Sequence, residues 1–218
     1  MKPVLLINLK TYEEGTGSKA MEIAKIADSF GSEVEIILAV QPADIRMISE
    51  NVSIPVFSQH VDPVEYGSHT GWILPESVKQ AGAVGTLLNH SERRMDFETL
   101  ERAMKRCRDV GLRTVVCAET PDKVKKFAAM KPDFIAIEPP ELIGGDVSVS
   151  RAKPHVITES VEKARPFGVP VLCGAGVKNQ DDVRRAKELG AKGILVASGV
   201  VKAGNPREAI EDLLRGFG

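Results

Sequence analysis

Short apolar runs alternate with helix-like segments along the whole sequence, and this alternation restricts the fold more than any other feature. Each run is rich in Val, Ile and Leu, which is typical of parallel strands buried on both faces. Eight such runs are each followed by a helical pattern: residues 4–8, 35–40, 55–59, 85–88, 113–117, 134–137, 170–173 and 193–196. Eight strand–helix units favour a closed parallel barrel over an open, doubly wound sheet. We therefore predict an α/β fold of the (β/α)8 barrel type.

No linker or low-complexity segment interrupts this pattern, so we expect residues 1–218 to form a single catalytic domain. The chain is shorter than the roughly 250 residues typical of such barrels. We expect the outer helices to be shortened, most visibly between Cys117 and Phe134. A dinucleotide-binding fold is the main competitor. It is disfavoured because Gly174-Ala175-Gly176 lies late in the chain and Asn179 stands where the third glycine of that fingerprint belongs.

Several helix ends can be placed from single residues. Asp96 precedes a helical stripe that stops at Gly111, a residue typical of a helix C-cap. Near the end of the chain, Asn205 is a candidate N-cap, with Pro206 at the first helical position and Glu208 two residues further on. These signals predict one long helix after the fourth strand and another at the end of the chain.

The composition excludes several classes of protein. The sequence holds 29 basic and 30 acidic residues spread along its length, so it has neither a nucleic-acid footprint nor a polybasic membrane segment. No apolar segment approaches the roughly 20 residues needed to span a bilayer. The three cysteines, Cys107, Cys117 and Cys173, are odd in number and not closely spaced, which indicates neither a disulfide framework nor a zinc ribbon. We expect a cytoplasmic protein.

A carboxylate stands at the end of the sixth apolar run. Four apolar residues, Phe134 to Ile137, are followed by Glu138 and two prolines that cannot extend a strand ladder. Glu138 therefore lies at the carboxyl end of a strand, the edge at which ligands bind in sheets built from strand–helix units. The loop beyond it, Pro139 to Asp146, reads as a lid that is stiff at the prolines and pliable at its glycines.

Three more polar side chains converge on the same edge. Asn8 with Lys10 follows the first strand, and His90 follows the fourth. A carboxylate that removes a carbon-bound proton, a donor that polarises a carbonyl and a fixed cation that stabilises an enediolate together support a 1,2-proton shift without metal or cofactor. Any one of these residues has an ordinary structural explanation, but the three together predict an active site.

The last two strands end in small residues. Gly174-Ala175-Gly176 follows the seventh strand and Ala197-Ser198-Gly199 follows the eighth, which leaves backbone N–H groups open to an anion. Ser198 to Val201 can begin a short helix whose N-terminus faces the same edge. Since barrels of this type commonly bind phosphate here, a small phosphorylated carbonyl compound is the predicted substrate.

At these residues the chain resembles the triosephosphate isomerase family. The match rests on Asn8-Leu9-Lys10, on Asn89 to Arg94, on Ile137-Glu138-Pro139 with its lid, and on the two glycine-containing loops, in the family's order and across the whole chain. The histidine-serine-glutamate-arginine-arginine segment within it is highly specific.

The resemblance implies a role for each of these residues. Glu138 is the catalytic base, His90 the neutral electrophile and Lys10 the electrostatic partner, paired with Glu92 in the free enzyme. The substrate-binding residues it implies are Asn8, Lys10, Ile143, Gly144, Gly174, Ala197 and Ser198. The reaction is the interconversion of dihydroxyacetone phosphate and D-glyceraldehyde 3-phosphate in glycolysis and gluconeogenesis, with no cofactor and no metal.

The chain also departs from the usual family pattern. Its lid lacks the tryptophan of most members and resembles the archaeal branch, and Cys173 and Gly176 replace a tyrosine that latches the closed lid and a serine. We expect phosphate binding to be retained, since backbone N–H groups provide most of it, and the lid contacts to differ. The polar loop from His60 to Trp72 matches the family's intersubunit loop. The resemblance therefore implies a homo-oligomer, and the archaeal branch a homotetramer.

Two alternatives remain open. One is another sugar-phosphate isomerase or epimerase on the same barrel. A metal-dependent form could use His60 and Asp62, although no third or fourth ligand is evident. The other is a non-catalytic protein that binds a phosphate ligand. Binding alone does not require a carboxylate opposite a dianionic ligand, so Lys10, His90 and Glu138 together argue against it.

Overall fold

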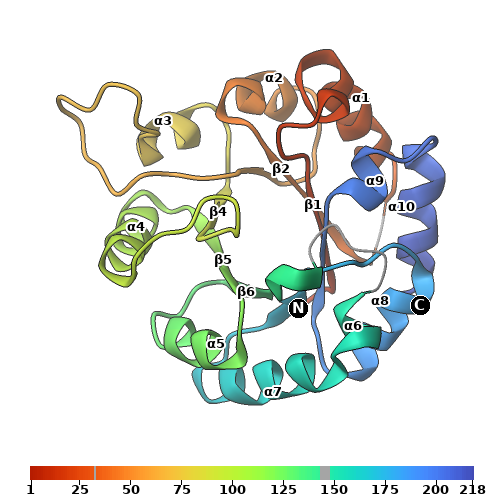
Figure 1. The fold of residues 1–218 in the computed structure, drawn as a ribbon. Helices are drawn as coiled ribbons and strands as arrows, with labels where there is room; N and C mark the ends of the chain where they lie inside the picture. Colours follow the sequence, from red (N-terminus) through yellow and green to blue (C-terminus); the bar gives the residue numbers. More distant parts are fainter. Residues whose placement is uncertain (32, 143–147) are drawn as a thin grey trace.

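The computed structural model describes residues 1–31, 33–142 and 148–218, and within them eight parallel strands close into a barrel in chain order (Figure 1). The strands are β1 (Val4–Asn8), β2 (Glu35–Val40), β3 (Val56–Ser58), β4 (Gly85–Leu88), β5 (Arg113–Ala118), β6 (Phe134–Ile137), β7 (Val171–Cys173) and β8 (Gly193–Val196). The first and last strands pair in parallel, with Val4 opposite Gly193, and so complete the ring. The predicted (β/α)8 barrel is confirmed.

Helices surround the barrel on its outside (Figure 1). The α-helices are α1 (Gly17–Asp28), α2 (Ile45–Ser49), α3 (Pro75–Gln80), α4 (Phe97–Val110), α5 (Pro121–Ala128), α6 (Val149–Ala152), α7 (Pro154–Ala164), α8 (Gln180–Glu188), α9 (Ser198–Val201) and α10 (Pro206–Arg215). Short 3-10 helices are η1 (Glu13–Gly15), η2 (Pro42–Asp44), η3 (Pro140–Leu142) and η4 (Arg165–Phe167). The last helix, α10, packs against α1 and α8, so the outer layer closes between the eighth and the first strand–helix units.

Several helix ends lie where the sequence predicts them. The Asp96 side chain accepts a hydrogen bond from the backbone N–H of Thr99 at 2.8 Å and caps α4, which ends at Gly111 in the left-handed conformation. Asn205 caps α10 by accepting from the N–H of Glu208. The expected short helix after β5 is also present, because α5 has eight residues.

Two predicted strands are shorter than expected. The third begins at Val56 rather than Pro55 and ends at Ser58, and the seventh begins at Val171 rather than Pro170. Proline has no N–H to donate to a strand ladder, so each ladder starts one residue later.

Strand residues are buried on alternating sides, in two separate apolar cores. Side chains that point into the barrel form the inner core: Val4, Leu6, Ile37, Ala39, Phe57, Leu87, Val115, Cys117, Phe134, Ala136, Leu172 and Leu195. The residues between them, such as Leu5 and Ile7 of β1, pack against the helices in the outer core. Burial on both faces explains why the strands read as continuous apolar runs.

One arginine covers the inner core at the amino-terminal end of the strands. The Arg113 guanidinium lies 5.6 Å from the ring centre of Phe57 and 5.5 Å from that of Phe134. It also makes two hydrogen bonds to the carboxylate of Glu35, at 2.6 and 3.1 Å. The planar cation can stack on both rings while its edge binds the carboxylate, which closes this end of the barrel.

Within the described residues, no helix is long and apolar enough to cross a lipid bilayer.

Closure of the barrel depends on the missing side chain of Gly193. A Cβ at this position would lie 2.1 Å from the carbonyl oxygen of Val4, a backbone atom that cannot move without disturbing the β1–β8 pairing. We predict that Gly193→Ala lowers the free energy of unfolding by about 1–3 kcal/mol, as overpacking of a core does. Denaturant unfolding of purified protein measures this loss.

Gly204→Ala is the matched control, because a Cβ there meets no atom within 4 Å. It should stay within about 0.5 kcal/mol of the wild type. Equal stability of the two variants would contradict the steric argument.

Candidate active site

The inward alternation of the strands carries polar side chains to the carboxyl-terminal mouth of the barrel. Asn8 continues the inward series of β1 beyond Leu6, and Glu138 continues that of β6 beyond Ala136. Both are almost fully buried. The same alternation that directs apolar side chains into the barrel core therefore directs polar side chains inward at its carboxyl-terminal mouth.

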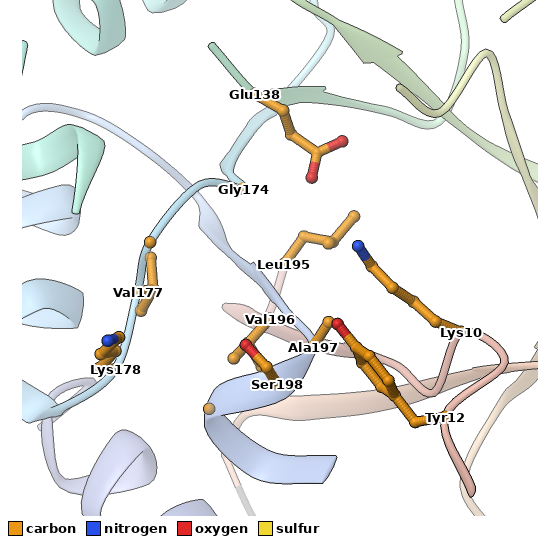
Figure 2. Close-up of a pocket in the computed structure, with 12 residues that line it drawn as sticks. Lys10, Tyr12, Glu138, Gly174, Val177, Lys178, Leu195, Val196, Ala197 and Ser198 are labelled. Carbon is orange, nitrogen blue, oxygen red and sulfur yellow. The ribbon is translucent and has the colours of Figure 1, made fainter. Parts of the chain in front are cut away.

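The residues predicted for the site line two adjoining cavities. The central cavity is bordered by Lys10, Glu138, Gly174, Ala197 and Ser198 (Figure 2). The side cavity is bordered by Asn8, Lys10 and His90, so Lys10 lines both. The structure therefore brings all these predicted residues to one mouth. Ile143 and Gly144 lie outside the described residues.

The side chain of Glu138 faces that of His90. Its Oε2 atom lies 3.7 Å from Nε2 of His90, and each of these two buried atoms is without a hydrogen-bond partner in the described structure. Buried polar atoms are normally paired, and exceptions of this kind concentrate at functional sites. The two atoms are placed to contact neighbouring atoms of one small ligand.

The position of the Glu138 side chain depends on Gly174. A Cβ at Gly174 would lie 2.5 Å from Cγ of Glu138, so a larger residue would displace the carboxylate. Gly174 itself is held in place because its N–H donates to the carbonyl of Ile137 at 3.0 Å. Neighbouring strands therefore fix both partners of this contact.

Burial raises the pKa of the Glu138 carboxyl above its ordinary value. His90, the thiol of Cys117, and the cations Lys10 and Arg94 oppose this effect but do not cancel it. Burial also raises the pKa of the Cys117 thiol well above its usual range, so Cys117 remains a neutral donor beneath the carboxylate. Cys117 is itself buried.

The ring of His90 is oriented by the turn that precedes it. Asn89 adopts a left-handed backbone conformation, with φ of 57°, and its amide bonds to the carbonyl of Cys117 and the N–H of Met95, both at 2.9 Å. The backbone N–H of Glu92 donates to Nδ1 of His90 at 3.2 Å. A ring whose Nδ1 accepts carries its other hydrogen-bonding position at Nε2, the atom that faces Glu138.

A second strained turn holds Lys10. Its φ is 50°, a conformation that costs an L-residue about 1–2 kcal/mol. Asn8 accepts from its N–H at 3.0 Å, and the Gln59 side chain donates to its carbonyl at 2.8 Å. The Lys10 ammonium bonds Glu92 at 2.9 Å, which confirms the predicted pair, and it extends toward Glu138 across the central cavity (Figure 2).

The opposite wall of the central cavity is built from small residues. Gly174 and Gly176 come from the loop after β7, and Ala197 and Ser198 stand at the start of α9. The predicted short helix at Ser198–Val201 is confirmed. Small side chains leave the backbone accessible here, which suits an anion.

Five residues that the sequence did not single out also line the central cavity: Tyr12, Val177, Lys178, Leu195 and Val196. Leu195 lies between Lys10 and Glu138, while Tyr12 and Lys178 stand at the rim (Figure 2). Leu195 follows the inward alternation of β8, but the correct parity becomes clear only with the barrel register. Tyr12 and Lys178 carry no local signal that distinguishes them from other exposed loop residues.

His60 and Asp62 serve the loop that follows β3. Nε2 of His60 lies 3.1 Å from Oδ1 of Asp62, whose Oδ2 accepts from the N–H of Ile73 at 2.7 Å. The Asp62 carboxylate thus joins the two ends of the 61–72 loop. Within the described part of the chain, no three potential metal ligands cluster together.

Comparison with known proteins gives a consistent result. Residues 3–214 match the protein family described as triosephosphate isomerase. The chain is 48% identical to the triosephosphate isomerase of Methanocaldococcus jannaschii over 216 residues, covering 97% of this chain and 99% of that protein. It is 46% identical to the enzyme of the same name from Methanosarcina acetivorans over 217 residues, or 98% of each chain. It is 44% identical to that of Methanothermus fervidus, also over 98% of each.

The raised pKa of Glu138 makes stability depend on pH in a defined direction. Well below pH 4.5, the ordinary value, the carboxyl is neutral in both folded and unfolded chains. As the pH rises through the folded-state pKa, a charge must be buried and stability is lost. We predict that Glu138→Gln is more stable than the wild type at pH 7 and that this advantage disappears below about pH 4.5. Denaturant unfolding at a series of pH values measures the difference.

Glu101→Gln, an exposed change on α4, is the control and should show no such pH-dependent gain. A stability difference for Glu138→Gln that stays constant with pH would contradict the assigned direction.

Proposed function

The chain belongs to the triosephosphate isomerase family, and we infer that it is an aldose–ketose isomerase interconverting dihydroxyacetone phosphate and D-glyceraldehyde 3-phosphate. The reaction is a step of glycolysis and gluconeogenesis and moves a proton between adjacent carbons through an enediolate. The observation that carries the chemistry is the buried Oε2 of Glu138 facing Nε2 of His90, two atoms without a hydrogen-bond partner among the described residues. We propose that the whole chain, residues 1–218, is the catalytic domain.

Glu138 is the proposed base. Its carboxylate removes a proton from the carbon next to the carbonyl and returns it to the neighbouring carbon. A general base works best when its pKa approaches the working pH, and burial moves the pKa of Glu138 in that direction. The contact with Gly174 keeps the carboxylate over the reacting carbons.

His90 is the proposed electrophile. Its Nε2–H donates to the carbonyl oxygen of the substrate as negative charge develops there. The bond from the N–H of Glu92 to Nδ1 keeps the ring in the neutral tautomer with the proton on Nε2. A neutral imidazole N–H is a weak acid, as an enediol is, so it suits the strongly basic enediolate oxygen, and it does not form an ion pair with Glu138 in the resting site.

Lys10 is the proposed electrostatic partner. Its ammonium stabilises the enediolate and the phosphate dianion, and it pairs with Glu92 before substrate binds. Asn8 holds the turn on which Lys10 stands.

The substrate phosphate is proposed to bind against the backbone of Gly174, Ala197 and Ser198. Ile143 and Gly144, outside the described residues, complete the proposed binding set. With no metal or cofactor in this scheme, the residues named here supply all of the chemistry.

We also propose that the enzyme is a cytoplasmic homo-oligomer, specifically a homotetramer. The 61–72 loop extends away from the barrel and exposes two large aromatic residues, Tyr66 at 68% and Trp72 at 55% (Figure 1). Exposed aromatic side chains on a projecting loop favour contact with another protein surface. The side cavity, of about 560 Å³, opens beside Asn8, Lys10 and His90 and can receive such a loop from a second copy.

The base assignment is tested by Glu138→Gln. Glutamine keeps the shape of the side chain but cannot accept the proton, so we expect turnover to fall by about 10²–10⁴-fold while substrate binding persists. Conversion of D-glyceraldehyde 3-phosphate to dihydroxyacetone phosphate, with and without a chelator, measures it. Glu101→Gln, remote on α4, should match the wild type. Near-normal turnover in Glu138→Gln would refute the assignment, and loss of wild-type turnover with chelator would favour a metal-dependent epimerase.

The oligomer is tested by shortening the 61–72 loop between Gly67 and Gly71. Removing the exposed tip should eliminate the contact between copies and disperse the assembly, since the aromatic residues lose their support. Sedimentation of wild-type and shortened protein at equal concentration measures the change. A shortened protein that still sediments as a tetramer would show that the loop does not hold the copies together.

A further inference from the structure

Asp182 is a buried carboxylate outside the catalytic set. It lies in the first turn of α8 and is only 3% exposed. Its Oδ1 accepts from the hydroxyl of Ser148 and from Nε of Arg151, both at 2.8 Å, and its Oδ2 accepts from the backbone N–H of Lys178 at 3.0 Å. Both carboxylate oxygens are therefore used by residues that precede the helix.

These partners belong to two different segments. Ser148 and Arg151 begin the described chain after the lid region, in and just before α6. Lys178 ends the loop that follows β7 and lines the central cavity with Gly174 and Gly176. One buried carboxylate thus joins the segment after the lid region to the loop that forms the proposed phosphate wall.

Additional hydrogen bonds run alongside this link. The N–H of Val149 donates to the carbonyl of Ala175 at 3.0 Å, and the hydroxyl of Ser150 donates to the backbone carbonyl of Asp182 at 3.3 Å. The hydroxyls of Ser148 and Ser150 lie 3.0 Å apart. The two segments therefore form one hydrogen-bonded unit centred on Asp182.

Capping of the helix does not account for this arrangement. Asn179 is the N-cap of α8 and accepts from the N–H of Asp182 at 3.1 Å. A second carboxylate, Asp212 of α10, accepts from the N–H and the side chain of Gln180 at 3.0 and 3.1 Å. Asn179 and Asp212 thus provide acceptors for the first turn of α8 without the side chain of Asp182. That side chain instead binds Ser148 and Arg151, which come before α7.

We propose that Asp182 is a positioning residue for the substrate phosphate, holding the 148–151 segment and the 174–178 loop in one fixed relation. The backbone groups of that loop then meet the phosphate in the geometry that the reaction requires. The inference rests on the proposed isomerase function. In this role Asp182 increases the binding energy gained from the substrate phosphate and makes no contact with the reacting carbons.

The test compares a substrate with phosphate and one without it. D-glyceraldehyde 3-phosphate carries the phosphate, while D-glyceraldehyde presents the same reacting carbons, whose proton exchange in deuterated water can be followed by NMR. For Asp182→Asn, we expect kcat/KM with the phosphorylated substrate to fall about 10- to 100-fold, the size typical of misplaced binding groups. Exchange with D-glyceraldehyde should change by less than about two-fold, because Gly174, which positions Glu138, is held separately by its hydrogen bond to the carbonyl of Ile137. Inorganic phosphate should also inhibit Asp182→Asn less strongly than the wild type, in step with the fall in kcat/KM for D-glyceraldehyde 3-phosphate.

Asp212→Asn is the matched control. It also removes a carboxylate charge that binds the first turn of α8, but from α10 and without touching Ser148, Arg151 or Lys178. It should leave both substrates unaffected. Arg151→Gln is the second variant, because this half-exposed side chain can be replaced without opening the interior. It should show the phosphate-selective loss even where Asp182→Asn does not fold.

The outcomes separate the inference from the proposed function. A wild type that does not isomerise D-glyceraldehyde 3-phosphate overturns the function itself. If the wild type is active but Asp182→Asn loses equally with both substrates, Asp182 has a merely structural role. The same conclusion follows if Asp212→Asn shows the loss as well. Absence of a phosphate-selective loss in both Asp182→Asn and Arg151→Gln likewise overturns the inference.

Discussion

The structure depends on keeping one carboxylate, that of Glu138, out of water without a full set of partners. Burial of such a group is unfavourable, so the carboxylate stays buried only where its surroundings prevent it from moving to a better-solvated position. The barrel provides this restraint from three sides, with Gly174 against Cγ, the Cys117 thiol beneath, and the strand pairing of β6 behind. Because the carboxylate cannot relax, the gap between it and His90 persists in the folded chain.

The neighbouring groups are held by similar means. Lys10 and Asn89 both occupy left-handed backbone conformations within two residues of a strand end, and side-chain amides support each turn. Residues held in rare backbone conformations need strong surroundings, and here the paired strands of the barrel provide them. The rigid sheet therefore fixes the positions of an ammonium and an imidazole, and electrostatic catalysis requires such fixed groups.

Much of this arrangement could be predicted from the sequence, because strand ends and their polar residues are local signals. Eight apolar runs gave the barrel, and the residues that follow them gave Lys10, His90 and Glu138. What could not be predicted depends on contacts between distant segments. The steric contact of Gly174 with Glu138 joins two strands, and the links of Asp182 join two loops. The inward direction of Leu195 required the barrel register, and the predicted roles of Ile143 and Gly144 lie outside the described residues.

The Arg113 cluster has a consequence for how such a protein can change over generations. It closes the amino-terminal end of the barrel with Glu35, Phe57 and Phe134, while the reacting groups stand at the opposite end. Selection can therefore adjust heat tolerance at one end and substrate preference at the other with little interference between them. A lineage that moves to a hotter or colder habitat can replace residues around Arg113 and leave its catalyst intact.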